Sequence, residues 1–223
     1  MRPPKHVLSM LLLSAAAGFA SATPAQLYSR AGGTMVYDSD LDVTWLADAN
    51  YAATQYEQSC GEIGAKDGRM EWARALRWAD ELVFGGYSDW RLPNSAQPDL
   101  SCDGQNPPEW GGGSFGFRCT GSELGHLFYG DINHGLGGKA GESITKTHNE
   151  NYFLFHNVVS GLYWHGTEFV VFPMISMNFH TSDGFMNFNS KSVLLRAWPV
   201  RDGDVADAPP IAEAKTKKPR KCK

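Results

Sequence analysis

The ten residues GGYSDWRLPN, from Gly85 to Asn94, stand where a predicted helix ends and the chain turns toward the core. Two glycines supply the positive φ angles that often end a helix, and Tyr-Ser-Asp is a composition typical of a turn. Trp90 is then placed to enter the core, and Pro93 ends the segment. Arg91 is expected to lie along the apolar edge and to pair with a carboxylate or with carbonyl groups; an anion-binding role is the alternative.

The helix before this stretch is predicted from Arg69 to Val83. In RMEWARALRWADELV, apolar side chains recur every three or four residues, and charged side chains fill the opposite face. Asp67-Gly68 is the expected cap at its start. The residues expected to face the core are Trp72, Ala75, Leu76, Ala79, Leu82 and Val83.

The other elements are predicted to be one more helix and several short strands. The stretch 33–50 alternates apolar and polar residues as in a β-hairpin, and its three aspartates, Asp38, Asp40 and Asp42, are interpreted as turn formers rather than calcium ligands. The stretch 120–132 predicts a helix capped by Thr120 or Ser122. From residue 152 onward, including YFLFHNVV, aromatic and β-branched residues predict an antiparallel sheet. The expected fold class is therefore α+β.

The two ends of the chain differ from its body. A basic start, a short apolar run and Ala-Ser-Ala at 20–22 predict a signal peptide over 1–22, with a membrane anchor as the alternative. The protein is thus expected to be exported, to the periplasm, the cell surface or the medium. Residues 207–223 lack a core pattern and are predicted to be a flexible basic tail. One domain, 23–206, remains between them.

Charge is distributed unevenly along the chain. Of 20 basic and 24 acidic residues, two basic ones lie in 1–22, and the last eleven residues hold six basic and one acidic. The stretch 23–212 therefore has 12 basic and 23 acidic residues, a net charge of −11. Such a body disfavours nucleic acid as a partner, whereas the tail could contact anionic polymers or lipids. No transmembrane segment is expected after the signal.

Four cysteines, Cys60, Cys102, Cys119 and Cys222, allow three complete pairings in an exported protein. We expect a Cys102–Cys119 disulfide, because both residues lie in one loop rich in glycine and proline. Cys60 and Cys222 are left open as a pair, as free thiols or as links to another chain. A loop of this length is commonly functional or disordered, and the expected bridge argues against disorder.

Six segments resemble, in order, the C-terminal domain of the Legionella collagen-like adhesins, formerly a domain of unknown function. They are VYDSDLDVTWLADANY, WARALRWADEL, GGYSDWRLPN, TGSELGHLFY, YWHGTEF and AWPVRDGD. The DWRLP element followed by a short helix is also similar to one shared by C-type-lectin-like folds and formylglycine-generating enzymes. The resemblance covers 27–205 and implies a C-type-lectin-like domain, with two short helices packed on a twisted, irregular antiparallel sheet and many loops. It also implies binding of sulfated polysaccharides at a surface, although this chain has no collagen-like tract.

Catalytic motifs are missing from the sequence. There is no G-x-S-x-G, H-E-x-x-H or P-loop pattern, and 121–212 contains no cysteine. No spacing selects a catalytic pair among the candidate carboxylates Asp131, Glu142, Glu150, Glu168 and Asp183. No cofactor is expected. One motif typical of calcium sites in C-type lectins is present, Gln97-Pro98-Asp99, but it is isolated and lies before the late strands rather than within them.

The function favoured by these observations is a secreted, non-catalytic recognition or adhesion module that binds a glycan or a surface protein. Trp110, Phe115 and Trp164 are the predicted ligand-binding residues, because aromatic rings on loops offer flat apolar faces. Each ring could instead pin its loop or belong to the core. An exported enzyme of lectin-like fold acting on glycans is one alternative. A structural envelope protein attached through its basic tail is the other.

Overall fold

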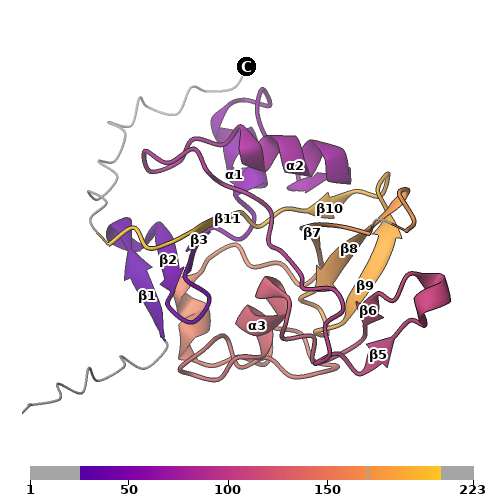
Figure 1. The fold of residues 1–223 in the computed structure, drawn as a ribbon. Helices are drawn as coiled ribbons and strands as arrows, with labels where there is room; N and C mark the ends of the chain where they lie inside the picture. The colour runs from indigo at the N-terminus through magenta and orange to yellow at the C-terminus, as the bar shows by residue number, and fades with distance from the viewer. Residues whose placement is uncertain (1–25, 170, 207–223) are drawn as a thin grey trace, which may run out of the picture.

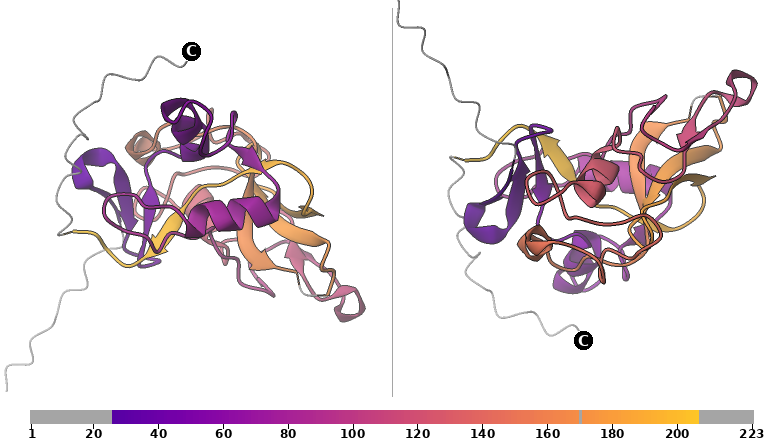
Figure 2. Two further views of the ribbon diagram at one scale, coloured as in Figure 1. Left: turned by 90° about the horizontal axis from the view of Figure 1, so that it is seen from above. Right: turned by 90° about the horizontal axis from the view of Figure 1, so that it is seen from below.

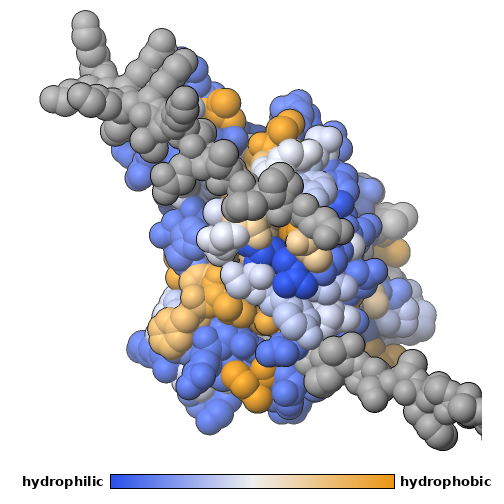
Figure 3. Space-filling model, turned by 90° about the vertical axis from the view of Figure 1, so that its left-hand side faces the viewer, coloured by the Kyte–Doolittle hydropathy of each residue, from blue (hydrophilic) through white to orange (hydrophobic). Residues whose placement is uncertain are grey.

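The computed structural model describes residues 26–169 and 171–206. The predicted signal peptide and basic tail lie outside the described residues. In the part described, the chain forms an α+β fold with three short α-helices and three sheets, which confirms the predicted fold class (Figure 1). None of these helices is long and apolar enough to cross a membrane. The side opposite the β5–β6 hairpin is mainly hydrophilic, with separate apolar islands (Figure 3).

The first sheet joins the start of the described chain to its end. Its antiparallel strands, in spatial order, are β1 (Leu27–Arg30), β2 (Met35–Asp38), β3 (Val43–Leu46) and β11 (Val200–Asp202). The predicted hairpin is thus β2–β3. The Asp38 carboxylate accepts the amide N–H groups of Asp40 and Leu41, and the Tyr37 hydroxyl donates to Asp42 at 2.9 Å. Asp38 and Asp42 therefore hold the turn, as predicted.

The second sheet has five strands. In spatial order they are β4 (Arg69–Met70), β10 (Leu195–Arg196), β7 (Leu162–Glu168), β8 (Ile175–His180) and β9 (Met186–Ser190). All neighbours are antiparallel except β10 and β7. The prediction of one antiparallel sheet is therefore too simple. The expected strand near residue 152 is wrong, because Glu150–Leu154 forms the 3-10 helix η3, in which the Asn149 side chain accepts the Asn151 N–H at 2.9 Å.

Residues 26–206, as far as they are described, contain three α-helices, one more than the sequence predicts. They are α1 (Tyr51–Gln58), which was not predicted, α2 (Trp72–Asp80) and α3 (Glu123–Tyr129). The Ser122 hydroxyl accepts the Gly125 N–H at 2.9 Å and so caps α3 as predicted. The start of α2 differs from the prediction, because Asp67 binds Arg69 instead of capping the helix.

The end of α2 also differs in part from the prediction. Gly85 and Gly86, predicted to end the helix, instead form the tight turn that follows it, with φ angles of 63° and 85° between Phe84 and Tyr87, which exchange two backbone hydrogen bonds of 3.0 Å. Val83, predicted to face the core, is 70% exposed. The helix ends at Asp80, so the 3.6-residue spacing no longer places Val83 over the core.

The segment from Trp90 to Asn94 passes between the two large sheets. Arg91 and Val200 of β11 exchange two backbone hydrogen bonds of 2.8 and 2.9 Å. Farther along, the Pro93 carbonyl accepts the Gly166 N–H of β7 at 2.8 Å. Trp90 is 2% exposed, as predicted for a core residue. The segment is thus a strap that fixes one sheet against the other.

The Arg91 side chain completes this strap through carboxylates. Its guanidinium donates to both Glu123 carboxylate oxygens at 2.8 Å and to Asp202 at 2.5 Å. Burial acts to lower the pKa of Arg91, but the hydrogen bonds to Glu123 and Asp202 outweigh it and raise the pKa. The predicted ion pairing is confirmed, and these internal carboxylates occupy the groups that an external anion would need.

Trp198 lies where the chain passes from β10 to β11. It is 1% exposed, and its ring centre lies 5.7 Å from that of Trp45, 5.2 Å from that of Phe155 and 5.7 Å from that of Tyr163. Its indole N–H donates to the Leu46 carbonyl at 2.9 Å. One residue therefore joins side chains from both large sheets and from the segment after η3.

His165 on β7 is buried beneath the strap. Its Nδ1 lies 3.3 Å from the Pro93 carbonyl oxygen, its Nε2 has no hydrogen-bond partner, and the residue is 0% exposed. Desolvation lowers the pKa of His165 from 6.5 to about 4, although the Pro93 and Asn94 carbonyls act to raise it. The imidazole is therefore neutral near neutral pH.

This burial predicts a loss of stability in acid. As the pH falls from about 6.5 to about 4, the unfolded chain protonates His165 before the folded chain does, so the folded state loses about 3 kcal/mol. We expect His165→Leu to remove most of this dependence, as measured by urea unfolding at a series of pH values. His134→Asn, at an exposed imidazole, should leave the dependence unchanged. An equally steep acid dependence in His165→Leu would contradict the prediction.

Candidate functional site

An aromatic hairpin projects from one end of the molecule (Figures 1 and 2). We call residues 103–118 the arm. Strand β5 (Gly104–Gln105) pairs with β6 (Ser114–Phe115), and the 3-10 helix η2 (Pro108–Trp110) lies between them. The chain reverses after η2 because Gly111 and Gly112 adopt φ angles of 88° and 63°, which side chains other than glycine rarely tolerate.

The base of the arm is tied together and to the body. Cys102 and Cys119 form the predicted disulfide across it. The Ser114 hydroxyl accepts the Asp99 N–H at 2.7 Å, and Gly116 exchanges two backbone hydrogen bonds of 2.9 and 2.8 Å with Met186 of β9. The disulfide and these hydrogen bonds lie at successive positions along the arm, so the arm is a rigid projection rather than a flexible loop.

Large apolar side chains are exposed where the arm meets the β7–β8 connection. Trp110 is 63% exposed, and on the connection Val171, Phe172 and Met174 are 54%, 46% and 76% exposed. We call these four residues the tip patch.

The two parts of the tip patch are held together by close packing. A Cβ added to Gly111 would lie 2.9 Å from both Phe169 and Val171, and one added to Gly113 would lie 2.6 Å from Phe169. Phe169, 6% exposed, thus lies directly beneath the glycines that follow Trp110. Trp110 and the exposed residues of the connection thus lie on adjoining segments above a packed base, and a cluster of exposed apolar side chains is typical of an interaction site.

The three predicted ligand-binding rings have different positions. Trp110 is exposed at the end of the arm, as the prediction requires. Phe115 is half-buried in β6, where a Cβ added to the facing Gly104 would lie 2.7 Å from its ring, so it helps to hold the hairpin. Trp164 is a correction. It is 0% exposed, and its N–H donates to the Met70 carbonyl at 2.9 Å inside the core, so it cannot contact a ligand of the folded protein.

The residues considered for calcium serve the base of the arm. The Asp99 carboxylate accepts the Ser101 N–H at 3.0 Å and the Gly121 N–H at 2.9 Å, and the side-chain oxygen Oε1 of Gln97 accepts the Ser114 N–H at 2.7 Å. Among the described residues, one cluster has ligand atoms close enough for a metal ion, Asp99 with Cys102 and Cys119. The two sulfur atoms are bonded to each other, so they are not thiolates that could ligate a metal.

Four of the five carboxylates considered for glycoside hydrolysis have local partners. Asp131 binds His134 at 2.8 Å, and Asp183 accepts the Phe185 N–H at 3.0 Å. Glu142 accepts the Thr147 hydroxyl, and Glu168 pairs with Lys191. In the part of the chain described, none of the five candidates lines the pocket between Asn50 and Val159 or the pocket beside Trp90.

Comparison of the chain with family models, with curated proteins and with solved structures found no match in any of the three. The adhesin-domain resemblance therefore stays a prediction.

No described cysteine is free, and Cys60 is disulfide-bonded. The sequence leaves open whether Cys222 is the partner of Cys60, and Cys222 lies outside the described residues.

The sequence reasoning missed the part of the tip patch on the β7–β8 connection. The run FVVFPMIS was assigned to a β segment, whereas the chain leaves β7 after Glu168 and re-enters the sheet at Ile175. Pro173 was the available signal, because proline interrupts a strand ladder and marks a turn inside an apolar run.

Proposed function

We propose that this protein is an exported, non-catalytic recognition or adhesion module that binds a surface protein or a glycan through the tip patch. The observation that carries the proposal is the 63% exposure of Trp110 at the end of a disulfide-braced arm. An indole exposed to water has an unfavourable hydration free energy, which binding would relieve. Because the arm that holds it is already ordered, little conformational entropy is lost when a partner binds. The adhesin-domain resemblance supports the same proposal.

The composition of the tip patch favours a protein as the partner. Val171 and Met174 offer aliphatic contact, and the residues nearest to Trp110 in sequence are two prolines, Glu109 and three glycines, which have no side chains. Sugar sites commonly combine a ring with several polar side chains, whereas apolar protein contacts need few. A glycan remains the second candidate because an exposed indole face also stacks on sugar rings.

The proposal predicts that Trp110→Ala weakens binding at least about tenfold, as expected for a central aromatic anchor. Labelled protein would be titrated on intact cells, with and without protease treatment, and on an array of neutral and sulfated glycans. Stability should stay within about 0.5 kcal/mol, because the ring is exposed.

Phe153→Ala is the matched control. Phe153 is 74% exposed on η3, the salmon-coloured turn at the opposite end of the molecule from the arm (Figures 1 and 2). Unchanged binding by Trp110→Ala, or binding lost equally in both variants, would contradict a role for the tip patch. Protease-sensitive binding to cells would identify a protein partner, and array binding a glycan.

A further inference from the structure

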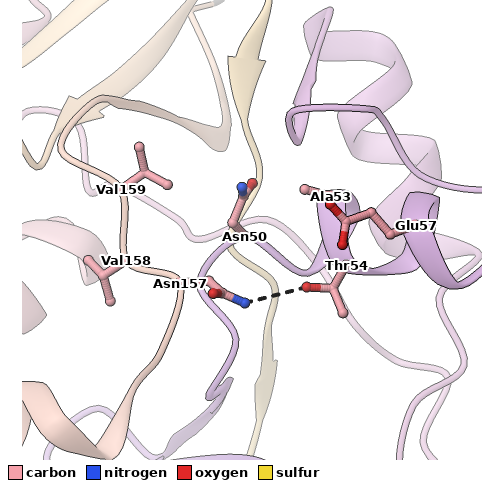
Figure 4. A pocket seen from close by; sticks show the side chains of 7 residues that line it. All are labelled: Asn50, Ala53, Thr54, Glu57, Asn157, Val158 and Val159. Atoms are coloured by element: carbon pink, nitrogen blue, oxygen red, sulfur yellow. Dashed lines mark hydrogen bonds between the residues drawn. The ribbon is translucent and has the colours of Figure 1, made fainter.

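A polar pocket of about 270 Å³ lies between α1 and the segment 157–159, and no role is assigned to it by the proposed function. Asn50, Ala53, Thr54 and Glu57 line it from the side of α1, and Asn157, Val158 and Val159 line it from the other side (Figure 4). We propose that this pocket binds a neutral, hydroxyl-rich small molecule, such as one sugar ring, independently of the tip patch.

The polar wall of the pocket is fixed from beneath by one carboxylate. Asp48 is 7% exposed, and its Oδ1 accepts the Asn50 N–H at 3.0 Å. Its Oδ2 accepts the Thr54 hydroxyl at 2.5 Å and the Asn157 amide at 3.0 Å. The buried Asp48 carboxylate therefore positions polar residues from both walls before a ligand arrives. Binding then costs little conformational entropy for ordering these side chains.

The backbone of Asn157 supports the same interpretation. Its φ angle is 54°, in the left-handed region where a residue other than glycine is uncommon. The bond to Asp48 fixes the exposed Asn157 against the pocket. Asparagine adopts this conformation readily, so the backbone can hold the side chain here without strain.

Asn50 lines the pocket, and no hydrogen bond from its side-chain Nδ2 is formed with the described residues. A Cβ added to Gly68 would lie 1.7 Å from Asn50 Oδ1, so this oxygen is packed against Gly68, where it is buried without a hydrogen-bond partner. The amide therefore keeps its Nδ2 hydrogens for a ligand acceptor. Asn157 Oδ1 and the Thr54 hydroxyl oxygen add acceptors on the same hollow.

Charge and size narrow the class of ligand. Among the described residues that line the pocket there is no lysine or arginine, whereas Glu57 lines it and Asp48 lies beneath it. Anionic ligands are therefore disfavoured. Ala53, Val158 and Val159 supply the apolar contact that the C–H face of a sugar requires, and the volume is below the range of sites for drug-sized molecules.

The test uses the full chain with its disulfides intact and ¹⁵N labels. Glucose, galactose, mannose and N-acetylglucosamine are titrated separately, and amide shifts at Asn50, Thr54 and Val158 are followed by NMR. We expect at least one neutral sugar to bind with a Kd of about 1 mM, and glucuronate to bind about tenfold more weakly because of its charge.

Two variants separate binding from folding. Ala53→Phe fills the hollow without removing a polar group, and Asn157→Gly removes the amide while keeping a residue suited to positive φ. Each is expected to weaken binding about tenfold, whereas Val83→Ala, at a residue that is 70% exposed and does not line the pocket, should bind as the parent chain does. No shift with any of the four sugars, unchanged affinity in either pocket variant, or glucuronate binding as tightly as the neutral sugars would overturn the proposal. Loss of cell binding in Trp110→Ala alone bears only on the tip patch.

Discussion

Replacing Trp198 with alanine is expected to lower the free energy of unfolding by about 4 kcal/mol. The indole fills the junction of the two large sheets, with aromatic rings on three sides and its N–H bonded to Leu46. Alanine would leave a cavity, and the surrounding rings belong to different elements that cannot all move into it. It would also leave the Leu46 carbonyl without this donor. Urea unfolding followed by far-UV circular dichroism measures the change.

Trp110→Ala is the matched control, since it makes the same chemical change at a residue 63% exposed. Trp198→Phe should restore part of the lost stability because it refills most of the volume but not the hydrogen bond. A loss below about 1 kcal/mol for Trp198→Ala would show that the junction relaxes around the cavity.

Replacing Arg91 with methionine is the second change expected to have a large effect, a loss of about 3 kcal/mol. Methionine keeps much of the apolar stem but removes the guanidinium. The Glu123 carboxylate, whose side chain is 15% exposed, would then keep the Asn94 N–H as a partner and lose both bonds to Arg91. Arg91→Lys should recover only part of the stability, because an ammonium cannot bind Glu123 in the bidentate manner while reaching Asp202.

The control for this change is Arg118→Met. Arg118 pairs with Asp103 at 3.1 Å, but its side chain is 67% exposed, so the loss should stay within about 0.5 kcal/mol. A double-mutant cycle with Glu123→Gln isolates the pair. If Arg91→Met and Arg118→Met cost the same, the strap does not depend on the buried cation.

The features that the sequence predicted well are those set by local pattern. The amphipathic spacing gave α2, Ser122 marked the start of α3, and alternation around Val43 gave the β2–β3 hairpin. The Cys102–Cys119 bridge and the exposure of Trp110 followed from a loop too rich in glycine and proline to bury its own rings. In each of these cases, neighbours along the chain determine the structure.

The features that it missed depend on distant partners. β4 has two residues, which the sequence assigned to the start of a helix, and it exists because it pairs with β10 across more than a hundred positions. Trp164 resembled an exposed ring because nothing near it in sequence shows that the Met70 carbonyl covers its N–H. The polar pocket has no sequence signal either, since Asp48 and Asn157 meet only through the fold.

The pairing of β3 with β11 has a consequence for the order in which the protein forms. Val43 of β3 lies opposite Asp202 of β11, so the first sheet lacks its last strand until translation has passed residue 202. The backbone of Arg91 likewise cannot form its two hydrogen bonds with Val200 until Val200 has been synthesised. A nascent chain therefore exposes the edge of β3 and an incomplete core until residues 200–202 have been synthesised, and the first sheet is completed only by a contact between distant parts of the chain.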